Sequence, residues 1–371
     1  MNTRITRTFG AVAVAAALGL GSGIAAVTAS PAYAGNSGTA YVVSQNSGTV
    51  TPIRTATNTT LKPIKVAGSG AAIAITPNGK TAYVADGSGA VIPFRTATSK
   101  VLKPIKIGGP GGFPNFIAIT PNGKTAYVIN GAGAVVPIRT ATNTALKPIT
   151  TGVGYLPGIA ITPNGKTAYV LAGDTVIPIR TATNTALKPI AAGTAPLGIA
   201  ITPNGKTAYV ANSGSDTVTP IRTATNTALK PIKVGKIPGP IAITPNGKTA
   251  YVVNLQSWTV TPIRTATNTA LKPIKVGTEP DAIAITPNGK TAYVLNQASG
   301  TVTPIWTATN TALREIKVGD SPMMIAFTAS GRTAYVVNYG SGAVTPIRTA
   351  TNTALEPITV GSGPVAIAIT P

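Results

Sequence analysis

The hydrophobic residues of this chain fall into short alternating runs that recur in the same order along the sequence. Each repeat reads close to TAYV-x-N, a loop of small residues, TVTPIRTATNTALKPIKVG, a Gly/Pro loop and IAITPNGK. Runs such as IAIT and TAYV are rich in β-branched or aromatic residues, which favour strands. Helical spacing is absent from the repeats. Each repeat therefore predicts four short β-strands.

The length of the repeat predicts the architecture. The block TAYV recurs at intervals of 40 to 44 residues, beginning at Thr39, Thr81, Thr125, Thr167, Thr207, Thr249, Thr291 and Thr333. Four strands per unit at this period are typical of a propeller blade. We therefore expect an all-β protein, an eight-bladed β-propeller of four-stranded blades.

Two turn motifs join the predicted strands into hairpins. The motif TPNGK, as at residues 76–80, occurs six times, and residues 328–332 form a variant of it. Its Pro presets φ at the second turn position, and its Gly supplies the positive φ that closes a hairpin. In the second motif, TATNT, the Asn can adopt a left-handed conformation. One unit is therefore two linked hairpins.

The two ends of the repeat region are complementary. The chain after Ala34 begins with a TAYV-type unit at 35–42 that has no IAIT run before it, and it ends with an IAIT run at 367–371 that has no TAYV run after it. We expect the C-terminal strand to join the N-terminal blade. The ring then has no orphan sheet edge at the join.

Proline stands inside two strands of nearly every repeat, as at Pro52 and Pro63. Proline cannot donate a ladder hydrogen bond, so it belongs on edge strands or at bulges. The outermost strand, LKPIKV, is an edge and tolerates it. For the third strand, VTPIR, we expect a local bulge or a broken ladder bond.

The repeats resemble the YVTN β-propeller repeat, and the resemblance covers essentially all of residues 35–371. Its motif is matched at Tyr127-Val-Ile-Asn130, Tyr209-Val-Ala-Asn212, Tyr251-Val-Val-Asn254, Tyr293-Val-Leu-Asn296 and Tyr335-Val-Val-Asn338. The resemblance implies a secreted, periplasmic or surface-layer protein whose propeller binds or scaffolds rather than catalyses, and it specifies no ligand. Three units depart from the motif, with Ser44, Asp86 and Ala172 in place of Asn. Arg also stands before TATNT, where the family usually has an acidic residue. A partner inferred from relatives with that acidic residue therefore does not carry over to this chain.

Residues 1–34 predict a signal peptide. Arg4 and Arg7 precede an apolar stretch over about residues 9–27, and Ala32-Tyr33-Ala34 has the small-residue pattern of a cleavage site. An uncleaved membrane anchor is the alternative. Cleavage leaves the propeller, residues 35–371, with no other segment able to span a bilayer as a helix. We expect a secreted or cell-surface-associated protein.

The charge of the chain suggests a partner class. It has 30 Lys and Arg and 8 Asp and Glu; without Arg4 and Arg7 the balance is about +20. The cations recur beside the turns at one end of the strands, giving a basic face, and on the outer strand, giving a basic rim. We expect polyanion binding on the basic face by Arg54, Arg95, Arg139, Arg180, Arg222, Arg264, Arg348, Lys80, Lys124, Lys166, Lys206, Lys248 and Lys290.

Several anions fit such an array: a cell-wall polymer, an acidic polysaccharide, phospholipid head groups or non-specifically bound nucleic acid. Nucleic acid would favour aromatic platforms interleaved with the charge, which the repeats do not provide. Alternatively, the charge serves only to keep the protein soluble. Trp306, which replaces a periodic Arg, is either a partner contact or drift at a surface turn.

The loops at the opposite end of the strands vary between units and hold most acidic and non-repeated aromatic residues. Phe113, Phe116, Met323 and Met324 are expected there. A second, protein partner would bind this variable face. Our candidates for that site are Trp258, Tyr155, Tyr339, Asp216, Glu279, Asp281 and Asp320. The repeated Tyr of TAYV, in contrast, is expected to pack between blades rather than to form a ligand-stacking ring.

The composition restricts the possible chemistry. The chain has no His, which excludes a Ser-His-Asp triad, a His-bearing zinc site and the commonest general base. We expect no cofactor and no metal. Glu279, Asp281 and Asp320 are the only candidates for acid/base work or for holding Ca²⁺. The favoured hypothesis is a non-enzymatic binding scaffold, and the alternative is a hydrolase or lactonase-like propeller with carboxylates at the channel mouth.

Overall fold

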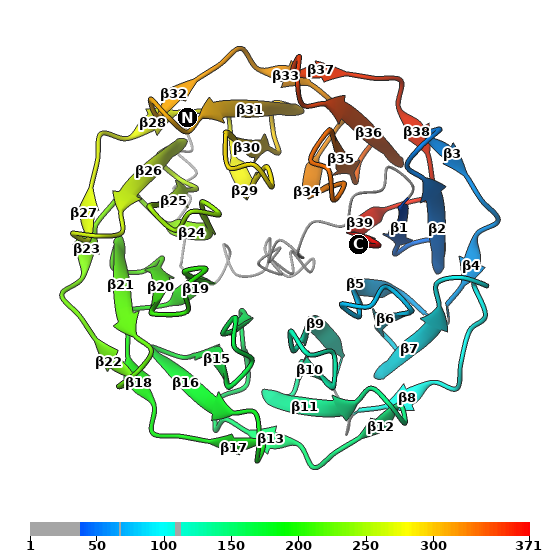
Figure 1. The fold of residues 1–371 in the computed structure, drawn as a ribbon, viewed down its shortest axis with the longest axis horizontal. Coiled ribbons are helices and arrows are strands. Elements are labelled where there is room, and N and C mark those ends of the chain that lie inside the picture. Colours follow the sequence, from blue (N-terminus) through cyan, green and yellow to red (C-terminus); the bar gives the residue numbers. More distant parts are fainter. Residues whose placement is uncertain (1–37, 67, 108–112) are drawn as a thin grey trace, which may run out of the picture.

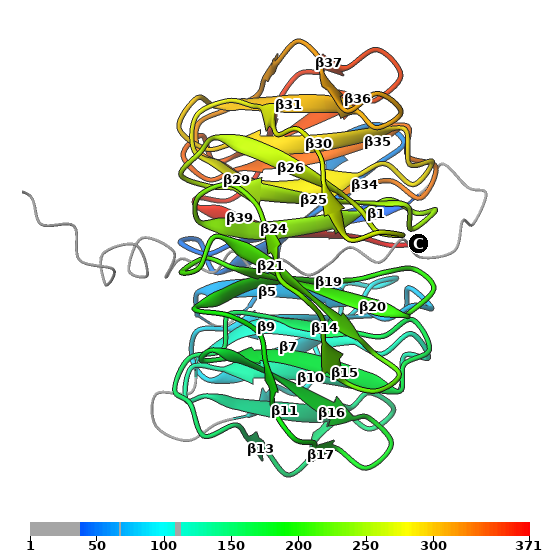
Figure 2. The ribbon, with the colours of Figure 1, turned by 90° about the vertical axis from the view of Figure 1, so that its left-hand side faces the viewer.

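Eight antiparallel blades form a closed ring in the computed structural model, which describes residues 38–66, 68–107 and 113–371 (Figure 1). The predicted signal peptide therefore lies outside the described residues. No helix occurs in these ranges. Seen edge-on, the inner strands such as β24 (Pro238–Ile243) run across the thickness of the disc (Figure 2). The predicted eight-bladed all-β propeller is confirmed.

The innermost strand of each blade comes from the IAIT run, as the alternation predicts. These strands are β39 (Pro364–Ile369), β5 (Gly70–Ile75), β9 (Pro114–Ile119), β14 (Ile159–Ile161), β19 (Pro196–Ile201), β24 (Pro238–Ile243), β29 (Pro280–Ile285) and β34 (Pro322–Phe327). We number the blades 1 to 8 in this order.

The second and third strands of each blade come from the TAYV and TVTPIR runs. The second strands are β1 (Thr39–Ser44), β6 (Thr81–Asp86), β10 (Thr125–Asn130), β15 (Thr167–Ala172), β20 (Thr207–Asn212), β25 (Thr249–Asn254), β30 (Thr291–Asn296) and β35 (Thr333–Asn338). The third strands are β2 (Thr49–Arg54), β7 (Ala90–Arg95), β11 (Ala134–Arg139), β16 (Thr175–Arg180), β21 (Thr217–Arg222), β26 (Thr259–Arg264), β31 (Thr301–Trp306) and β36 (Ala343–Arg348).

The outermost strand is split into two short pieces in seven of the blades. The pieces are β3 (Thr59–Thr60) and β4 (Ile64–Lys65), β12 (Thr144–Ala145) and β13 (Ile149–Thr150), β17 (Thr185–Ala186) and β18 (Ile190–Ala191), β22 (Thr227–Ala228) and β23 (Ile232–Lys233), β27 (Thr269–Ala270) and β28 (Ile274–Lys275), β32 (Thr311–Ala312) and β33 (Ile316–Lys317), and β37 (Thr353–Ala354) and β38 (Ile358–Thr359). Blade 2 has β8 (Ile105–Lys106) and an isolated bridge between Phe94 and Val101.

Proline explains the split. Tyr41 pairs with Pro52 in an unbroken register, so β2 carries no bulge against β1. Leu61 N donates to Pro52 O at 2.8 Å, which shows that the carbonyl of Pro52 faces the outer strand. The nitrogen of a strand residue points to the same side, so the missing N–H faces the gap between β3 and β4. The expected broken ladder bond is confirmed between the third and outer strands.

The bulges lie on the innermost strand instead. In blade 1, Val43 pairs with Ala366 but Ser44 pairs with Pro364, so Val365 is an extra residue on β39. Of the two alternatives expected for the third strand, a bulge or a broken ladder bond, the structure therefore has the broken bond. The bulge lies next to Pro364, whose nitrogen cannot donate a ladder hydrogen bond, and bulges tolerate proline for this reason.

The ring closes through the two ends of the repeat region. β39 pairs with β1, with Ala40 opposite Ile369 and Val42 opposite Ile367. In Figure 1 the red β39 lies beside the blue β1 and β2. The predicted closure is confirmed, and blade 1 contains both termini of the repeats.

The hydrophobic core lies between blades. Eight clusters of buried side chains lie between neighbouring blades, and the cluster between blades 1 and 2 also contains Met323 of blade 8. Between blades 5 and 6, for example, Tyr209 and Val218 pack with Ile241 and Val252. Full burial of one such aliphatic side chain contributes about 1.5–3 kcal/mol. Each blade is therefore stabilised by its two neighbours.

Candidate polyanion-binding face

The TPNGK turn fixes the position of its lysine. In blade 2, Gly79 N donates to Thr76 O at 2.7 Å, and Gly79 has a φ of 70°. Thr76 Oγ1 and Lys80 N both bond Asn78 Oδ1, at 2.7 and 3.0 Å. The side-chain oxygen of Asn78 therefore braces the turn from inside, and Lys80 leaves it at the start of β6.

Blades 2 to 6 each place an arginine beside that lysine. In blade 2, Arg95 ends β7 and pairs with Thr81, the residue that follows Lys80. Thr96 N also donates to Lys80 O at 3.2 Å. Two cations thus leave the same end of the blade from neighbouring strands.

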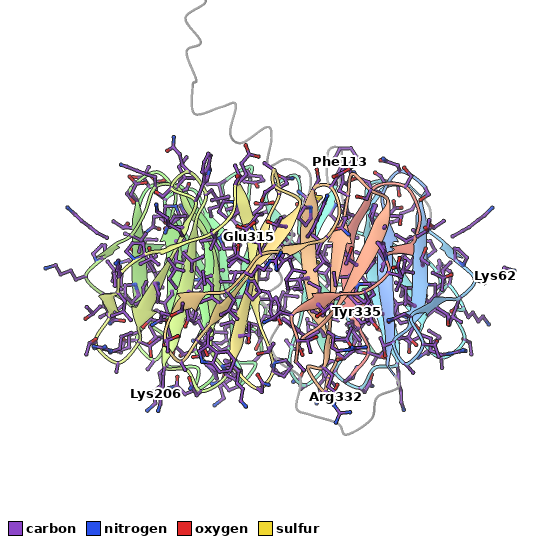
Figure 3. The ribbon with its side chains drawn as sticks, turned by 90° about the horizontal axis from the view of Figure 1, so that it is seen from above. Lys62, Phe113, Lys206, Glu315, Arg332 and Tyr335 are labelled. Carbon is purple, nitrogen blue, oxygen red and sulfur yellow. The ribbon has the colours of Figure 1, made fainter. Side chains whose placement is uncertain are left out.

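Fourteen cations gather in this way at one end of the ring, and all of them are exposed. They are the thirteen predicted residues together with Arg332: Lys80, Lys124, Lys166, Lys206, Lys248, Lys290 and Arg332 at the turns, and Arg54, Arg95, Arg139, Arg180, Arg222, Arg264 and Arg348 on the third strands. We call this set the basic face. Figure 3 shows Lys206 and Arg332 on the side of the disc opposite Phe113.

Arg332 was missing from the predicted site. It occupies the lysine position of the variant turn at 328–332, where Gly331 N donates to Thr328 O at 2.8 Å as in the other turns. Gly331 has a φ of 67°. Aligning residues 328–332 with the TPNGK repeats of the same chain matches Gly331 to the turn glycine and Arg332 to the turn lysine, so the repeat pattern was a signal for Arg332.

The turns that carry the lysines pack against one another around the ring. A Cβ built on Gly123 would lie 3.2 Å from Pro77 Cδ of the preceding blade, and one on Gly165 would lie 3.4 Å from Pro121 Cδ. The same contact recurs from blade to blade and places Gly79 against Pro371. The lysine positions therefore form a continuous row.

The hairpins that carry the arginines are fixed by the repeated tyrosines. Tyr127 of blade 3 donates its hydroxyl hydrogen to Asn184 Oδ1 of blade 4 at 2.6 Å and lies 3.4 Å from Thr181 O. Asn184 has the left-handed φ, 54°, that was predicted for this position. The predicted packing role of the tyrosines is confirmed, and the structure adds a hydrogen bond between blades that the sequence did not reveal.

The basic face has no carboxylates. All eight acidic residues of the chain lie in the described ranges, and none occupies a TPNGK-type turn or the end of a third strand. An ion pair elsewhere joins Lys236 Nζ and Asp216 Oδ2 at 2.6 Å. The hydrogen bond from Lys236 holds the pKa of Asp216 below its usual value. The cations of the face therefore repel one another without internal neutralisation.

The variable face is partly aromatic. Phe113, Tyr155 and Trp258 expose 56%, 55% and 48% of their surfaces. Tyr339 is only partly exposed, because it packs against the core between blades 1 and 2. Tyr155 precedes β14, and Phe113 precedes β9 of the neighbouring blade.

Two residues expected on the variable face belong to the core. Phe116 is 8% exposed and packs between blades 3 and 4, and Met323 is 7% exposed and joins the cluster between blades 1 and 2. Met324 is partly buried against the same cluster. These residues lie near the start of the inner strands β9 and β34, where the side chains already pack against neighbouring blades.

The candidate carboxylates come from neighbouring blades, as expected. Glu279 and Asp281 flank the start of β29 in blade 7, and Asp320 precedes β34 in blade 8. Asp281 is buried, with 8% of its surface exposed. Within residues 38–66, 68–107 and 113–371, no three His, Cys, Asp or Glu side chains gather closely enough to hold a metal ion. Glu279, Asp281 and Asp320 are therefore not gathered into one such cluster.

The described part of the chain contains no helix of the length and apolarity needed to span a bilayer.

Solved structures share this fold at low sequence identity. Hydrazine synthase of Kuenenia stuttgartiensis matches at a TM-score of 0.62 and 23% identity, over 75% of this chain and 95% of that one. The dihydro-heme d1 dehydrogenase NirN, solved in complex with DHE, matches at 0.75 and 13%, over 93% and 78%. A functionally unknown protein from Desulfotomaculum acetoxidans matches at 0.61 and 18%, over 90% and 99%.

No protein-family model and no curated protein matches the sequence. The structural matches establish the fold alone: this chain is an eight-bladed β-propeller.

Proposed function

We propose that the protein is an exported, non-enzymatic β-propeller of the YVTN-repeat type that binds anionic polymers at the cell surface or in the medium. The basic face is the principal docking surface, and the basic rim adds to it. The observation that carries the proposal is the row of fourteen exposed cations with no carboxylate among them.

Multivalency supplies the affinity. One exposed ion pair contributes only about 0.2–1 kcal/mol. A polymer that contacts many cations at once adds these terms, because every contact after the first is intramolecular. The turns and the hairpins fix the backbone positions of the cations, so little loop entropy is lost on binding.

The rim extends the positive field around the disc. Its lysines come from the LKPIK segments and include Lys62, which projects from the outer edge in Figure 3. They face outward from separate blades, whereas the lysines of the basic face stand on turns in mutual contact. We expect the rim to speed encounter with the polymer and to contribute less to the bound state.

The variable face is the proposed site for a second, protein partner. Phe113 and Tyr155 lie before the inner strands of adjacent blades and are more than half exposed. Exposed aromatic side chains of this kind are favoured at protein interfaces. A polymer-bound propeller would thus keep its opposite face free.

Retention on immobilised polymers tests the proposal. The purified protein is applied to cell wall, a sulfated polysaccharide and DNA at low and at physiological salt. We expect retention on at least one polymer at low salt and a progressive loss as salt rises, because bound counterions are released on association. Absence of retention on all three, or retention that salt does not change, would contradict the proposal.

A further inference from the structure

The paired cations of the basic face are complete only over part of the ring. Blade 1 has Gly38 at the lysine position, and blade 7 has Trp306 at the arginine position. Blades 2 to 6 carry both cations without a gap. We call this set the basic arc; it consists of Lys80, Arg95, Lys124, Arg139, Lys166, Arg180, Lys206, Arg222, Lys248 and Arg264.

The basic arc is continuous and rigid. The Gly-to-Pro contact between successive turns is present at every step of the arc. A Cβ built on Gly205 would lie 3.4 Å from Pro163 Cδ, and one on Gly247 would lie 3.4 Å from Pro203 Cδ. Its hairpins are held by Tyr hydroxyls, as where Tyr209 donates to Asn268 Oδ1 at 2.6 Å. The ten cations therefore extend from backbone positions that follow a fixed curved path.

Trp306 lies where the arc ends. It is the last residue of β31, opposite Thr291, and 40% of its surface is exposed. The hairpin that follows it is held by Tyr251 of blade 6, which donates to Asn310 Oδ1 at 2.6 Å. Trp306 therefore belongs to blade 7, the blade next to the one that carries the last pair of the arc.

This combination is selective for a class of polymer. A protein that binds single-stranded nucleic acid interleaves aromatic platforms with its cations so that successive bases stack, and no aromatic side chain interrupts the ten cations of the arc. A sugar ring has a face of C–H groups that packs on an indole, while its carboxylate or sulfate groups pair with Arg and Lys. One indole at the end of a cationic path thus fits an acidic sugar chain.

We propose that the basic arc is the track for a linear acidic polysaccharide and that Trp306 stacks on a sugar ring at its blade 7 end. This inference rests on the proposed function, because it names the polymer and the sector of the basic face that binds it. Blade 8, which carries Arg332 and Arg348 outside the arc, then contributes less.

Two double variants, each of which removes two positive charges, test which sector of the basic face binds the polymer. K166A/R180A removes the pair at the middle of the arc, and R332A/R348A removes the pair of blade 8. With sulfated oligosaccharides as probes, the first variant is expected to lose about tenfold in affinity and to reduce the salt slope of log K by about 2. The second is expected to change affinity by less than about threefold. Equal losses would overturn the arc but leave the proposed function, and no loss in either would contradict both.

The dependence of affinity on oligosaccharide length is a second test of the basic arc. Affinity for the oligosaccharides should rise with chain length until the arc is spanned and then level off, because each added unit within reach makes another intramolecular contact. A constant affinity across lengths would mean that one local cluster, not a track, binds the sugar.

The stacking partner is tested by fluorescence, since the chain has two Trp residues. W258F leaves Trp306 as the reporter, and W306F leaves Trp258 on the other face. Oligosaccharide binding should shift the emission of W258F and leave that of W306F unchanged; no shift in W258F would overturn the role of Trp306. Tighter binding of single-stranded DNA than of a sulfated oligosaccharide with the same number of charges would overturn the polysaccharide.

Discussion

Tyr335 of the last blade donates its hydroxyl hydrogen to Asn58 Oδ1 of the first blade at 2.6 Å. The same hydroxyl lies 3.2 Å from Thr55 O. The same hydrogen bond, from a repeated Tyr to the turn Asn of the next blade, occurs between consecutive blades, and we call it the latch. Here it joins residues 277 positions apart. The closure of the ring therefore has a polar contact as well as the pairing of β39 with β1.

Removing the hydroxyl of Tyr335 should destabilise the ring at its closure. Tyr335→Phe removes the donor to two partly buried acceptors, and we expect a loss of about 1–2 kcal/mol in the free energy of unfolding, measured by urea titration. The control is Tyr339→Phe on the variable face, with an expected change below about 0.5 kcal/mol. Equal stability of the two variants would contradict the role of the latch.

Alkaline pH should open the latches together. Burial raises the pKa of Tyr83, Tyr127, Tyr169, Tyr209, Tyr251, Tyr293 and Tyr335 from the ordinary value of 10.0 to about 12. The folded state thus favours the neutral phenol, and this stabilisation is complete below pH 10 and is lost as the pH rises through 12. Circular dichroism and phenolate absorbance, followed together, should change between these values. Phenolate formation near pH 10 in a protein that stays folded would argue against buried hydroxyls.

Blade 2 lacks one half of its latch and can be repaired. Ser99 stands where the other blades have Asn, with a φ of 55°, and Tyr41 donates only to Thr96 O at 2.7 Å. Ser99→Asn should add a side-chain acceptor and a residue that tolerates the left-handed conformation better. We expect a gain of about 0.5–1 kcal/mol. The reverse change in blade 3, Asn143→Ser, should cost a similar amount, and the prediction fails if both changes have the same sign.

The carboxylates of the variable face should be dispensable for polymer binding. Glu279→Gln and Asp281→Asn together leave the basic face unchanged, so the affinity for a sulfated polysaccharide should stay within about twofold. Because Asp281 is buried, a thermal melt of the double variant is the folding control. A large loss of affinity in a folded variant would place the binding site on the variable face.

The architecture could be read from the sequence because one repeat determines every blade. The eight TAYV runs, the turns such as 76–80 and the complementary ends predicted the number of blades and the closure. The positive φ of Asn58 and Gly79 was predicted as well, since local turn chemistry alone decides it.

What the sequence did not reveal depends on contacts between units. The partner of Tyr335 lies in a different blade, and no periodic pattern identifies which atoms meet across that interface. The direction of Pro52 N, and thus the split of the outer strand, depends on which side of the third strand its carbonyl faces. Phe116 and Met323 looked like loop residues because their burial arises from the ring, not from their neighbours in sequence.

In the proposed function the cations of one face, not the net charge in general, bind the polymer. The direct measurement is calorimetric titration of a sulfated polysaccharide into two variants that have each lost four positive charges. The face variant is K166A/R180A/K206A/R222A, and the rim variant is K188A/K230A/K233A/K272A. We predict that the face variant loses about a hundredfold in affinity at low salt and the rim variant no more than about tenfold. Equal losses in the two variants would mean that net charge, and not the basic face, determines binding.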